Sequence, residues 1–571
     1  MSMFDAFVER FHAHFTQNPN SRVTLGVNRD LGELPDPSLA AIARRDDEAA
    51  ELLEEIAGVP RDELSFDQRL DLDLAALMLE SERYNDRYTF NGRTQAQQLP
   101  SCGDDVGGGI FLMLINDPRP AAERLEDITS RLEKVSGYVE ALLGRLDTPV
   151  ARWVSMDVQK VEGLPQLFDT VEAMATEEAW PELPRLTRAR AEAEQALTSY
   201  VERLKKLPTT TQLHVGEKIA REIVRLRGID KSLEEIHSIA KSFLADTQGE
   251  LASLRTRLVQ KHGLPADTTM DQLEHFLAEK HPVQLKDGKL ESVLDRYQQE
   301  RRKILAFIHE RDLFPVFEDQ DMRIVRTPSF LEPSIPAGAM VQPAPFRDGT
   351  KRSLVYLTLS EELLAEHTEL SIPNMMIHEG IPGHHLQLAT AATHPSVVRR
   401  HVEAMDHAEG WTTMLEGYML DVGYMGELTD EARFTGKRDI ARIGARVGID
   451  LFFMTGDKGY LDLGVDCDVT SDDPFVSAGK LLAEVTGFVP GRVQAELNWY
   501  SQERGYPLSY LTGNRLVLEL KRDLAAANAG KLEGLELDRR FHALYMGSGN
   551  MPLANLRRVF EHEGLVECAS A

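Results

Sequence analysis

Histidines gather in one short stretch of the chain. Six of the 17 histidines lie between residues 378 and 407, where an even distribution would place about one. Imidazole nitrogens are common ligands of zinc and related transition metals, and carboxylates often complete such sites. The stretch is therefore a candidate metal site, and a packed histidine cluster without a metal is the alternative.

His378 and Glu379 begin a sequence that matches only part of the zinc-hydrolase signature HExxH. In that signature two histidines lie four residues apart on one face of a helix, so both reach one ion, and the glutamate acts as a general base. Here the fifth residue is Pro382, and the next histidines are His384 and His385. A site on a straight helix is therefore excluded.

A break in the helix would bring a second histidine to the same ion. Seven residues of α-helix rise about 10.5 Å, too far for His378 and His385 to share zinc through bonds of about 2.1 Å. Pro382 lacks a backbone donor and Gly383 tolerates unusual dihedral angles, so a bulge or break is expected here. His384 is then the predicted second ligand, and His385 is the reserve candidate.

A third, acidic ligand is expected from a second helix. A helix-like segment carries Glu409, 25 residues after His384, a spacing common in zincins whose third ligand is glutamate. Glu416, two turns further on, is a backup ligand or a support for one. One zinc ion per chain, held by His378, His384 and Glu409, is therefore predicted. Glu379 would act first as general base and then as general acid toward the leaving amine.

A strand precedes this segment. The sequence RSLVYLTLS, Arg352–Ser360, is the clearest strand in the chain and follows a region rich in proline. In zinc peptidases an edge strand before the metal helix can bind an extended peptide through main-chain hydrogen bonds. We therefore expect this strand at a sheet edge beside the site.

These motifs resemble a large bacterial family known as domain of unknown function 885. The family is marked by a His-Glu-x-x-Pro-Gly-His-His-Leu-Gln core, here His378–Gln387, and by a later Glu-Gly-Trp, here Glu409–Trp411. The resemblance begins near Pro19–Ser38 and ends in Phe541–Leu556, so it covers most of the chain.

A second stretch, Leu497–Asn514, is similar to the helical zinc peptidases of the carboxypeptidase Taq type. The shared residues are Trp499, Gly505, Tyr506, Pro507, Tyr510, Gly513 and Asn514. In such enzymes a tyrosine in this stretch faces the metal and donates a hydrogen bond to the oxyanion, a role that the resemblance implies for Tyr510. Tyr506 and Tyr500 are the reserve candidates for this role, and together with His385 they are assigned to substrate binding. For each tyrosine, a core residue with a satisfied hydroxyl is the alternative. The resemblance also implies a homodimer.

Two further patterns, one of arginines and one of glycines, are weaker candidates for function. Arg438, Arg442 and Arg446 recur at helical spacing, and either bind a substrate carboxylate or form a solvated or ion-paired stripe. Gly107–Gly109 lack the flanking strand and the lysine of a phosphate-binding loop, so they predict an ordinary loop.

The elements that must position the site are mostly helices. Helical periodicity dominates residues 37–313 and resumes after residue 360. The predicted fold is mostly α, a helical zincin-like (gluzincin) metallopeptidase fold with a small β-sheet beside the metal helix. The predicted parts are an N-terminal helical region, 1–313, which forms the walls of a groove, and a zincin-like catalytic region, 314–571, packed as one compact body.

The composition of the chain limits the classes of molecule that it is expected to bind. The formal net charge of −28 disfavours binding to nucleic acids and to anionic membranes. The three cysteines form no CxxC pair, and the first residues lack the apolar run of a signal peptide. We therefore expect a cytoplasmic protein.

These features together predict a zinc-dependent peptidase, carboxypeptidase-like or oligopeptidase-like, that hydrolyses short peptides by attack of metal-bound water. One alternative is a metal-dependent hydrolase of a small amide or ester. The other is a helical scaffold that has lost catalysis and uses its groove for binding.

Overall fold

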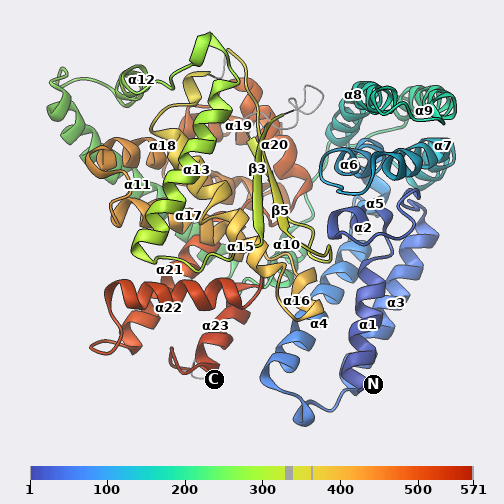
Figure 1. Cartoon of the computed structure of the whole chain (residues 1–571), viewed down its shortest axis with the longest axis horizontal. Coiled ribbons are helices and arrows are strands. Elements are labelled where there is room, and N and C mark those ends of the chain that lie inside the picture. The colour runs from blue at the N-terminus through green and yellow to red at the C-terminus, as the bar shows by residue number, and fades with distance from the viewer. Residues whose placement is uncertain (1, 328–337, 362–363, 569–571) are drawn as a thin grey trace. The chain divides into compact units, whose positions relative to one another are not determined.

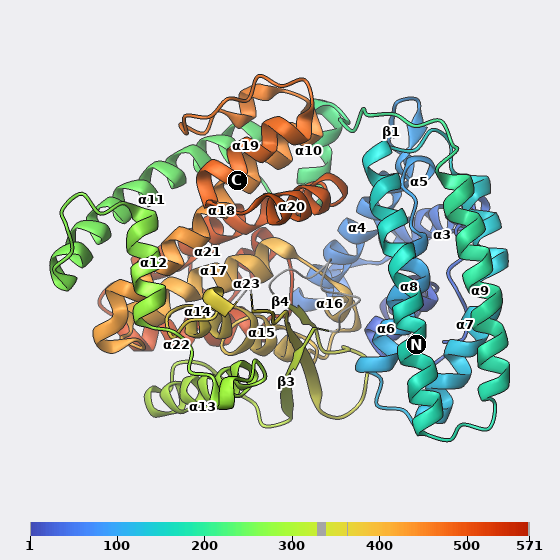
Figure 2. The same ribbon diagram turned by 90° about the horizontal axis from the view of Figure 1, so that it is seen from above.

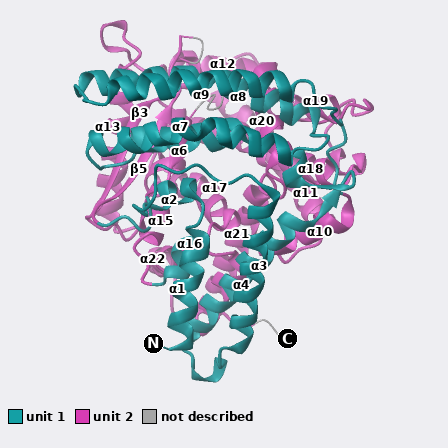
Figure 3. Ribbon diagram, turned by 90° about the vertical axis from the view of Figure 1, so that its right-hand side faces the viewer, with its two compact units in different colours: residues 1–215, 344–348, 396–401 teal, residues 216–343, 349–395, 402–571 magenta. Residues whose placement is uncertain are grey.

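Helices make up most of the chain, as the periodicity predicts (Figure 1). The computed structural model describes residues 2–327, 338–361 and 364–568. These residues form two compact units, coloured separately in Figure 3. The first unit comprises residues 1–215, 344–348 and 396–401, and the second comprises residues 216–343, 349–395 and 402–571.

Long helices build the first unit, and α6 to α9 lie side by side (Figure 3). Ser38 caps the helix Leu39–Gly58, because its side chain accepts a hydrogen bond from the backbone of Ala41 (3.2 Å). The elements are α1 (Met3–Phe15), α2 (Pro19–Leu25), α3 (Leu39–Gly58), α4 (Phe66–Arg87), β1 (Thr89–Phe90), β2 (Arg93–Thr94), α5 (Gln95–Gln98), α6 (Cys102–Ile115), α7 (Ala121–Arg145), α8 (Ala151–Glu177), α9 (Leu183–Leu204) and α16 (Val397–His401).

The predicted loop at Gly107–Gly109 is wrong, because these residues lie inside α6. A Cβ atom at Gly109 would collide with the guanidinium of Arg131, which is fully buried on α7. The guanidinium donates to the backbone oxygen of Leu31 (2.6 Å) and to the side chain of Asn20 (2.5 Å). The glycines therefore allow a buried arginine to pack against the helix, which local sequence rules do not reveal.

Residues 216–313, which were predicted to belong to the N-terminal region, belong to the second unit. Helix α11 packs lengthwise on α18 (Figure 2), and Gly444 allows close contact with Phe243 and Leu244. The helices of this unit are α10 (Glu217–Leu226), α11 (Leu233–His262), α12 (Met270–Lys280), α13 (Ser292–Arg311), α14 (Ser371–Met375), α15 (His384–Ala391), α17 (Met405–Asp421), α18 (Thr429–Thr455), α19 (Pro474–Thr486), α20 (Pro490–Gln502), α21 (Ser509–Ala527), α22 (Gly534–Gly547) and α23 (Leu553–His562).

A three-stranded sheet lies in the second unit, with the order β3-β5-β4. Strand β3 (Gln320–Arg326) pairs in parallel with β5 (Lys351–Leu357), and β4 (Gly338–Val341) pairs with β5 in the antiparallel sense. The predicted strand is thus confirmed, but its expected place at the edge is wrong. Residues 353–357 of β5 are buried without alternation, as is typical of a strand that is covered on both faces.

Within the described ranges, every helix is too short or too polar to traverse a lipid bilayer.

Candidate metal centre

The predicted break between His378 and His384 is present. Helix α14 continues as one turn of π-helix over Met376–Gly380 and then ends. The backbone becomes extended at Ile381, and α15 begins at His384. Single turns of π-helix are rare in proteins and occur frequently at functional sites. The interruption brings a second histidine back toward the first.

Glycine and tryptophan fix this break. A Cβ atom at Gly383 would overlap the carbonyl oxygens of Ile377 and His378, so only glycine fits there. The indole nitrogen of Trp411, a fully buried residue of α17, donates to the carbonyl oxygen of Pro382 (2.9 Å). The Glu-Gly-Trp motif on α17 therefore holds the turn that connects the two histidines.

Helix α17 also packs closely on α21. A Cβ atom at Gly410 would lie 2.6 Å from the backbone of Gly513, and one at Gly513 would overlap the carbonyl oxygen of Asp406. Only glycines allow the two helices this approach. The contact places Glu409 of α17 beside Tyr510 of α21.

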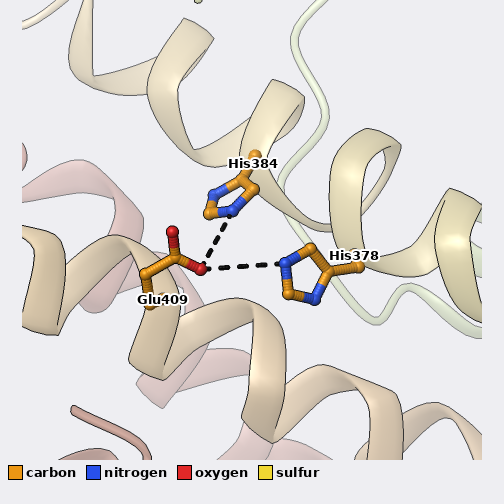
Figure 4. A group of neighbouring side chains, drawn as sticks. All are labelled: His378, His384 and Glu409. Carbon is orange, nitrogen blue, oxygen red and sulfur yellow. Dashed lines mark ion pairs between the residues drawn. The ribbon is translucent and has the colours of Figure 1, made fainter. Parts of the chain in front are cut away.

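Three side chains from these elements converge on one buried point (Figure 4). The Nε2 atoms of His378 and His384 lie 3.7 and 3.4 Å from Oε2 of Glu409. The ligand atoms of all three residues lie within 4.8 Å of one another. A tetrahedral zinc ion with bonds of about 2.1 Å separates its ligand atoms by about 3.4 Å. The geometry therefore fits one zinc ion.

The remaining polar atoms of two of these ligands are anchored. Nδ1 of His378 forms a hydrogen bond with Oε1 of Glu416 (2.7 Å), and Asn374 donates to the other oxygen of Glu416 (3.3 Å). The hydroxyl of Tyr506 donates to Oε1 of Glu409 (3.2 Å). These contacts leave Nε2 of His378 and Oε2 of Glu409 for a metal, in the pattern of supported metal ligands.

Oε2 of Glu409 is buried and has no hydrogen-bond partner among the described residues. A buried carboxylate oxygen that accepts no hydrogen bond is costly, and a bound cation removes that cost. The orphaned oxygen is therefore a second indication, besides the distances, that a metal belongs here.

The charges of the site are strongly coupled. Burial lowers the pKa of His378, but the hydrogen bond with Glu416 and the neighbouring carboxylates outweigh it and raise this pKa to about 9. Burial raises the pKa of Glu409, but His384, His378 and the hydroxyl of Tyr510 outweigh it and lower this pKa to about 2. An anionic glutamate therefore faces the imidazoles, as a metal site requires.

A pocket of about 680 Å³ opens beside the triad. His378, Glu379 and Tyr510 line it. Glu379 is half-buried, and among the described residues its carboxylate has no hydrogen-bond or ion-pair partner. The ring of Tyr510 stacks on that of Tyr506, with centroids 5.9 Å apart and planes inclined by 15°. A free carboxylate and a phenol thus face the same space as one imidazole of the triad.

His385 does not join the triad. Its Nδ1 atom forms a hydrogen bond with Ser353 (2.7 Å) and its Nε2 atom with Gln320 (2.6 Å), so both ring nitrogens are bound to the sheet. Successive residues of a helix are rotated by about 100°, so His385 turns away where His384 turns inward. The structure thus gives no support to His385 as the reserve ligand.

Tyr500 lies in the core and not at the pocket. Its side chain is fully buried, its hydroxyl accepts from Arg446 Nε (2.8 Å), and it donates to Glu496. Tyr506 supports Glu409, as described above. Tyr500 is therefore a core residue with a satisfied hydroxyl. The hydroxyls of Tyr500 and Tyr506 both bind protein groups, whereas the sequence predicted that they bind substrate.

Sequence reasoning missed Asp450, a fully buried residue of α18. Its carboxylate accepts hydrogen bonds from the backbone of Gly505 and of Leu508 (3.1 Å each). Asp450 thereby holds the turn that leads into α21 and its Tyr510. The residue lies four positions after Arg446, the last member of the arginine stripe, but no local pattern separates it from other helical aspartates.

Residues 19–559 match the model of a family of bacterial proteins of unknown function, DUF885. The chain belongs to this family. The match includes the sheet and the residues of the candidate metal centre, so the resemblance read from His378–Gln387 and Glu409–Trp411 is confirmed at the level of the family. A search of curated proteins finds no significant match.

Two solved structures share the fold of this family member. A "putative lipoprotein" from Colwellia psychrerythraea has a TM-score of 0.79 at 16% identity, and the alignment covers 99% of each chain. A "putative lipoprotein of unknown function" from Shewanella oneidensis has a TM-score of 0.76 at 16% identity, over 98% of this chain and 99% of the other. These likenesses show the mostly helical fold alone. A cytoplasmic location, a homodimer and the absence of nucleic-acid or membrane partners stay predictions for this chain.

Proposed function

We propose that this protein is a zinc-dependent peptidase with a zincin-like active centre that hydrolyses short peptides. The observation that carries the proposal is the convergence of His378, His384 and Glu409 beside a pocket that also receives Glu379 and Tyr510. Two histidines and a glutamate are a donor set of catalytic zinc sites, which keep one position open for water or substrate. Structural zinc sites usually have four protein ligands.

A zinc ion at this triad would supply a Lewis acid that acidifies water and polarises a substrate carbonyl. Glu379 follows His378 directly and lines the pocket. Its carboxylate would accept the proton of the attacking water and then deliver it to the leaving amine. Tyr510 would donate a hydrogen bond to the oxygen that gains negative charge.

The pocket favours a small polar substrate. A volume of about 680 Å³ lies in the usual range for small-molecule sites, so a short peptide fits and a folded chain does not. Gly338 of β4 lines the pocket, and β4 is an outer strand among those described. An extended peptide would therefore pair with β4 and not with the central strand β5. The similarity of Leu497–Asn514 to carboxypeptidases of the Taq type supports a carboxypeptidase or an oligopeptidase.

The test is a digest of a mixed peptide library by the zinc-loaded protein, with Glu379→Gln beside it. Glutamine keeps the size of the side chain but cannot accept a proton, so kcat is expected to fall at least 100-fold with zinc content unchanged. Peptide hydrolysis that persists undiminished in Glu379→Gln would contradict the proposed mechanism. Cleavage of small amides or esters, but of no peptide, would move the assignment to another hydrolase.

A further inference from the structure

Four arginines line the pocket, and one of them contacts the tyrosine of the centre. Arg438 is paired with Asp271 and Glu274 (2.6 and 3.0 Å), away from the aromatic residues. Arg446, two turns further along α18, has its guanidinium carbon 4.4 Å from the ring centroid of Tyr510. The arginines of the predicted stripe therefore differ in what they contact.

The guanidinium of Arg446 is held in one orientation. Its Nε donates to the hydroxyl of Tyr500 (2.8 Å), and its Nη2 donates to Glu496 (2.9 Å). The hydroxyl of Tyr500 donates to the same carboxylate oxygen, which closes the arrangement. Arg446 is only 6% exposed, and the planar guanidinium fork binds with a fixed direction. Arg446 is thus a rigid, charged surface.

Aromatic rings rest on this surface. The guanidinium carbon lies 5.3 Å from the ring of Trp499 as well as 4.4 Å from that of Tyr510. Trp499 in turn meets Tyr506 edge-on, with centroids 4.8 Å apart, and Tyr506 stacks on Tyr510. A cation–π contact becomes stronger when the cation is shielded from water, as the buried guanidinium of Arg446 is. The ring of Tyr510 is therefore fixed by contacts that do not involve its hydroxyl.

We infer that Arg446 is a positioning residue that orients Tyr510 for the hydrolytic step. The inference rests on the proposed function, in which the hydroxyl of Tyr510 stabilises the developing oxyanion. A hydrogen bond to a transition state depends steeply on direction and distance, and a displacement of about 1 Å can cost about 100-fold in rate. Arg446 acts through the ring of Tyr510 and does not touch the reacting atoms.

A double-mutant cycle separates this role from simple packing. Tyr510→Phe is expected to lower kcat about 100-fold or more, with KM little changed. Arg446→Met is expected to lower kcat about 10- to 100-fold, again with KM little changed. Because Arg446 acts through the Tyr510 hydroxyl, the double variant should be no slower than Tyr510→Phe alone. If the kcat losses of the two single variants multiply in the double variant, the inference is overturned.

Arg446→Met leaves Glu496 buried without its partner and can weaken folding. Tyr500→Phe is the second variant, since it removes only the hydroxyl that accepts from Arg446. It should lower kcat several-fold, and this loss should vanish in the Tyr510→Phe background. The matched control is Arg438→Met on the same helix, whose effect should multiply with that of Tyr510→Phe.

A readout without catalysis is the ¹⁹F resonance of Tyr510 in metal-free protein labelled with 3-fluorotyrosine, assigned from Tyr510→Phe. The resonance should shift and broaden in Arg446→Met and in Tyr500→Phe but not in Arg438→Met. An unchanged resonance in the first two would overturn the inference. If the wild type cleaves no substrate, the proposed function fails, and these spectra still decide whether Arg446 positions Tyr510.

Discussion

His378 has a carboxylate near each of its ring nitrogens. Glu416 binds Nδ1 at 2.7 Å, and Glu409 lies 3.7 Å from Nε2. The first contact fixes the tautomer and orientation of the ring. The second places Nε2 beside the carboxylate oxygen with which it would share a metal ion. The chemistry of the centre therefore depends on a residue that would not itself bind the ion.

Glu416→Gln tests this support. The amide can still form a hydrogen bond, but it loses the charge that makes His378 a stronger ligand, so zinc affinity should fall about 10- to 100-fold. Competition with a chromogenic zinc chelator measures the affinity. Glu427→Gln, on the exposed turn Gly426–Leu428, is the control and should leave it unchanged. Equal affinities for Glu416→Gln and wild type would contradict the role of Glu416.

The raised pKa of His378 gives a pH dependence with a definite sign. Its pKa is about 9 in the folded, metal-free protein and about 6.5 when unfolded, so its contribution to stability is complete below pH 6.5. The contribution is lost as the pH rises from about 6.5 through about 9. Thermal unfolding of metal-free protein at pH 6 to 9 should show a steeper loss for wild type than for His378→Gln. Parallel curves would contradict the pKa.

At the scale of elements, glycines decide how closely α17 approaches α21. Two glycines of α17 form a matched pair for a test. A Cβ atom added at Gly410 would clash with Gly513, whereas one added at Gly417 would meet no atom within 4 Å. Gly410→Ala should lower the free energy of unfolding by about 1–3 kcal/mol through overpacking. It should also reduce activity, because it separates Glu409 from Tyr510.

Gly417→Ala should instead leave activity intact and raise the free energy of unfolding by up to about 1 kcal/mol, since alanine favours helix. Denaturant unfolding and peptide hydrolysis measure the two effects. Equal behaviour of Gly410→Ala and Gly417→Ala would show that the close contact of the helices does not position the site.

The elements differ in how far the sequence determines them. The break between His378 and His384 could be predicted because Pro382 and Gly383 act locally on the backbone. The place of β5 at the centre of its sheet could not, since it depends on pairing with strands that are distant in sequence. The prediction of a loop at Gly107–Gly109 was wrong for the same reason, because the residue that Gly109 accommodates, Arg131, lies on another helix.

At the scale of the whole molecule, the convergence of His378, His384 and Glu409 was predictable because motif and spacing are properties of the sequence. The residues that orient the side chains around this triad could not be predicted. Arg446 stood out only as part of a stripe of arginines, and no local pattern marked Asp450. Their roles depend on packing between α18, α20 and α21. The division near residue 215 likewise depends on the packing of α11 along α18.

The whole chain should hold one zinc ion. The direct measurement is metal content by mass spectrometry, on protein purified without a histidine tag or chelator, with His378→Ala and Glu409→Ala beside it. We predict about one zinc per chain in the wild type and a loss in both variants, with unchanged circular dichroism. A folded wild type that contains no metal, even after dialysis against zinc, would contradict the account.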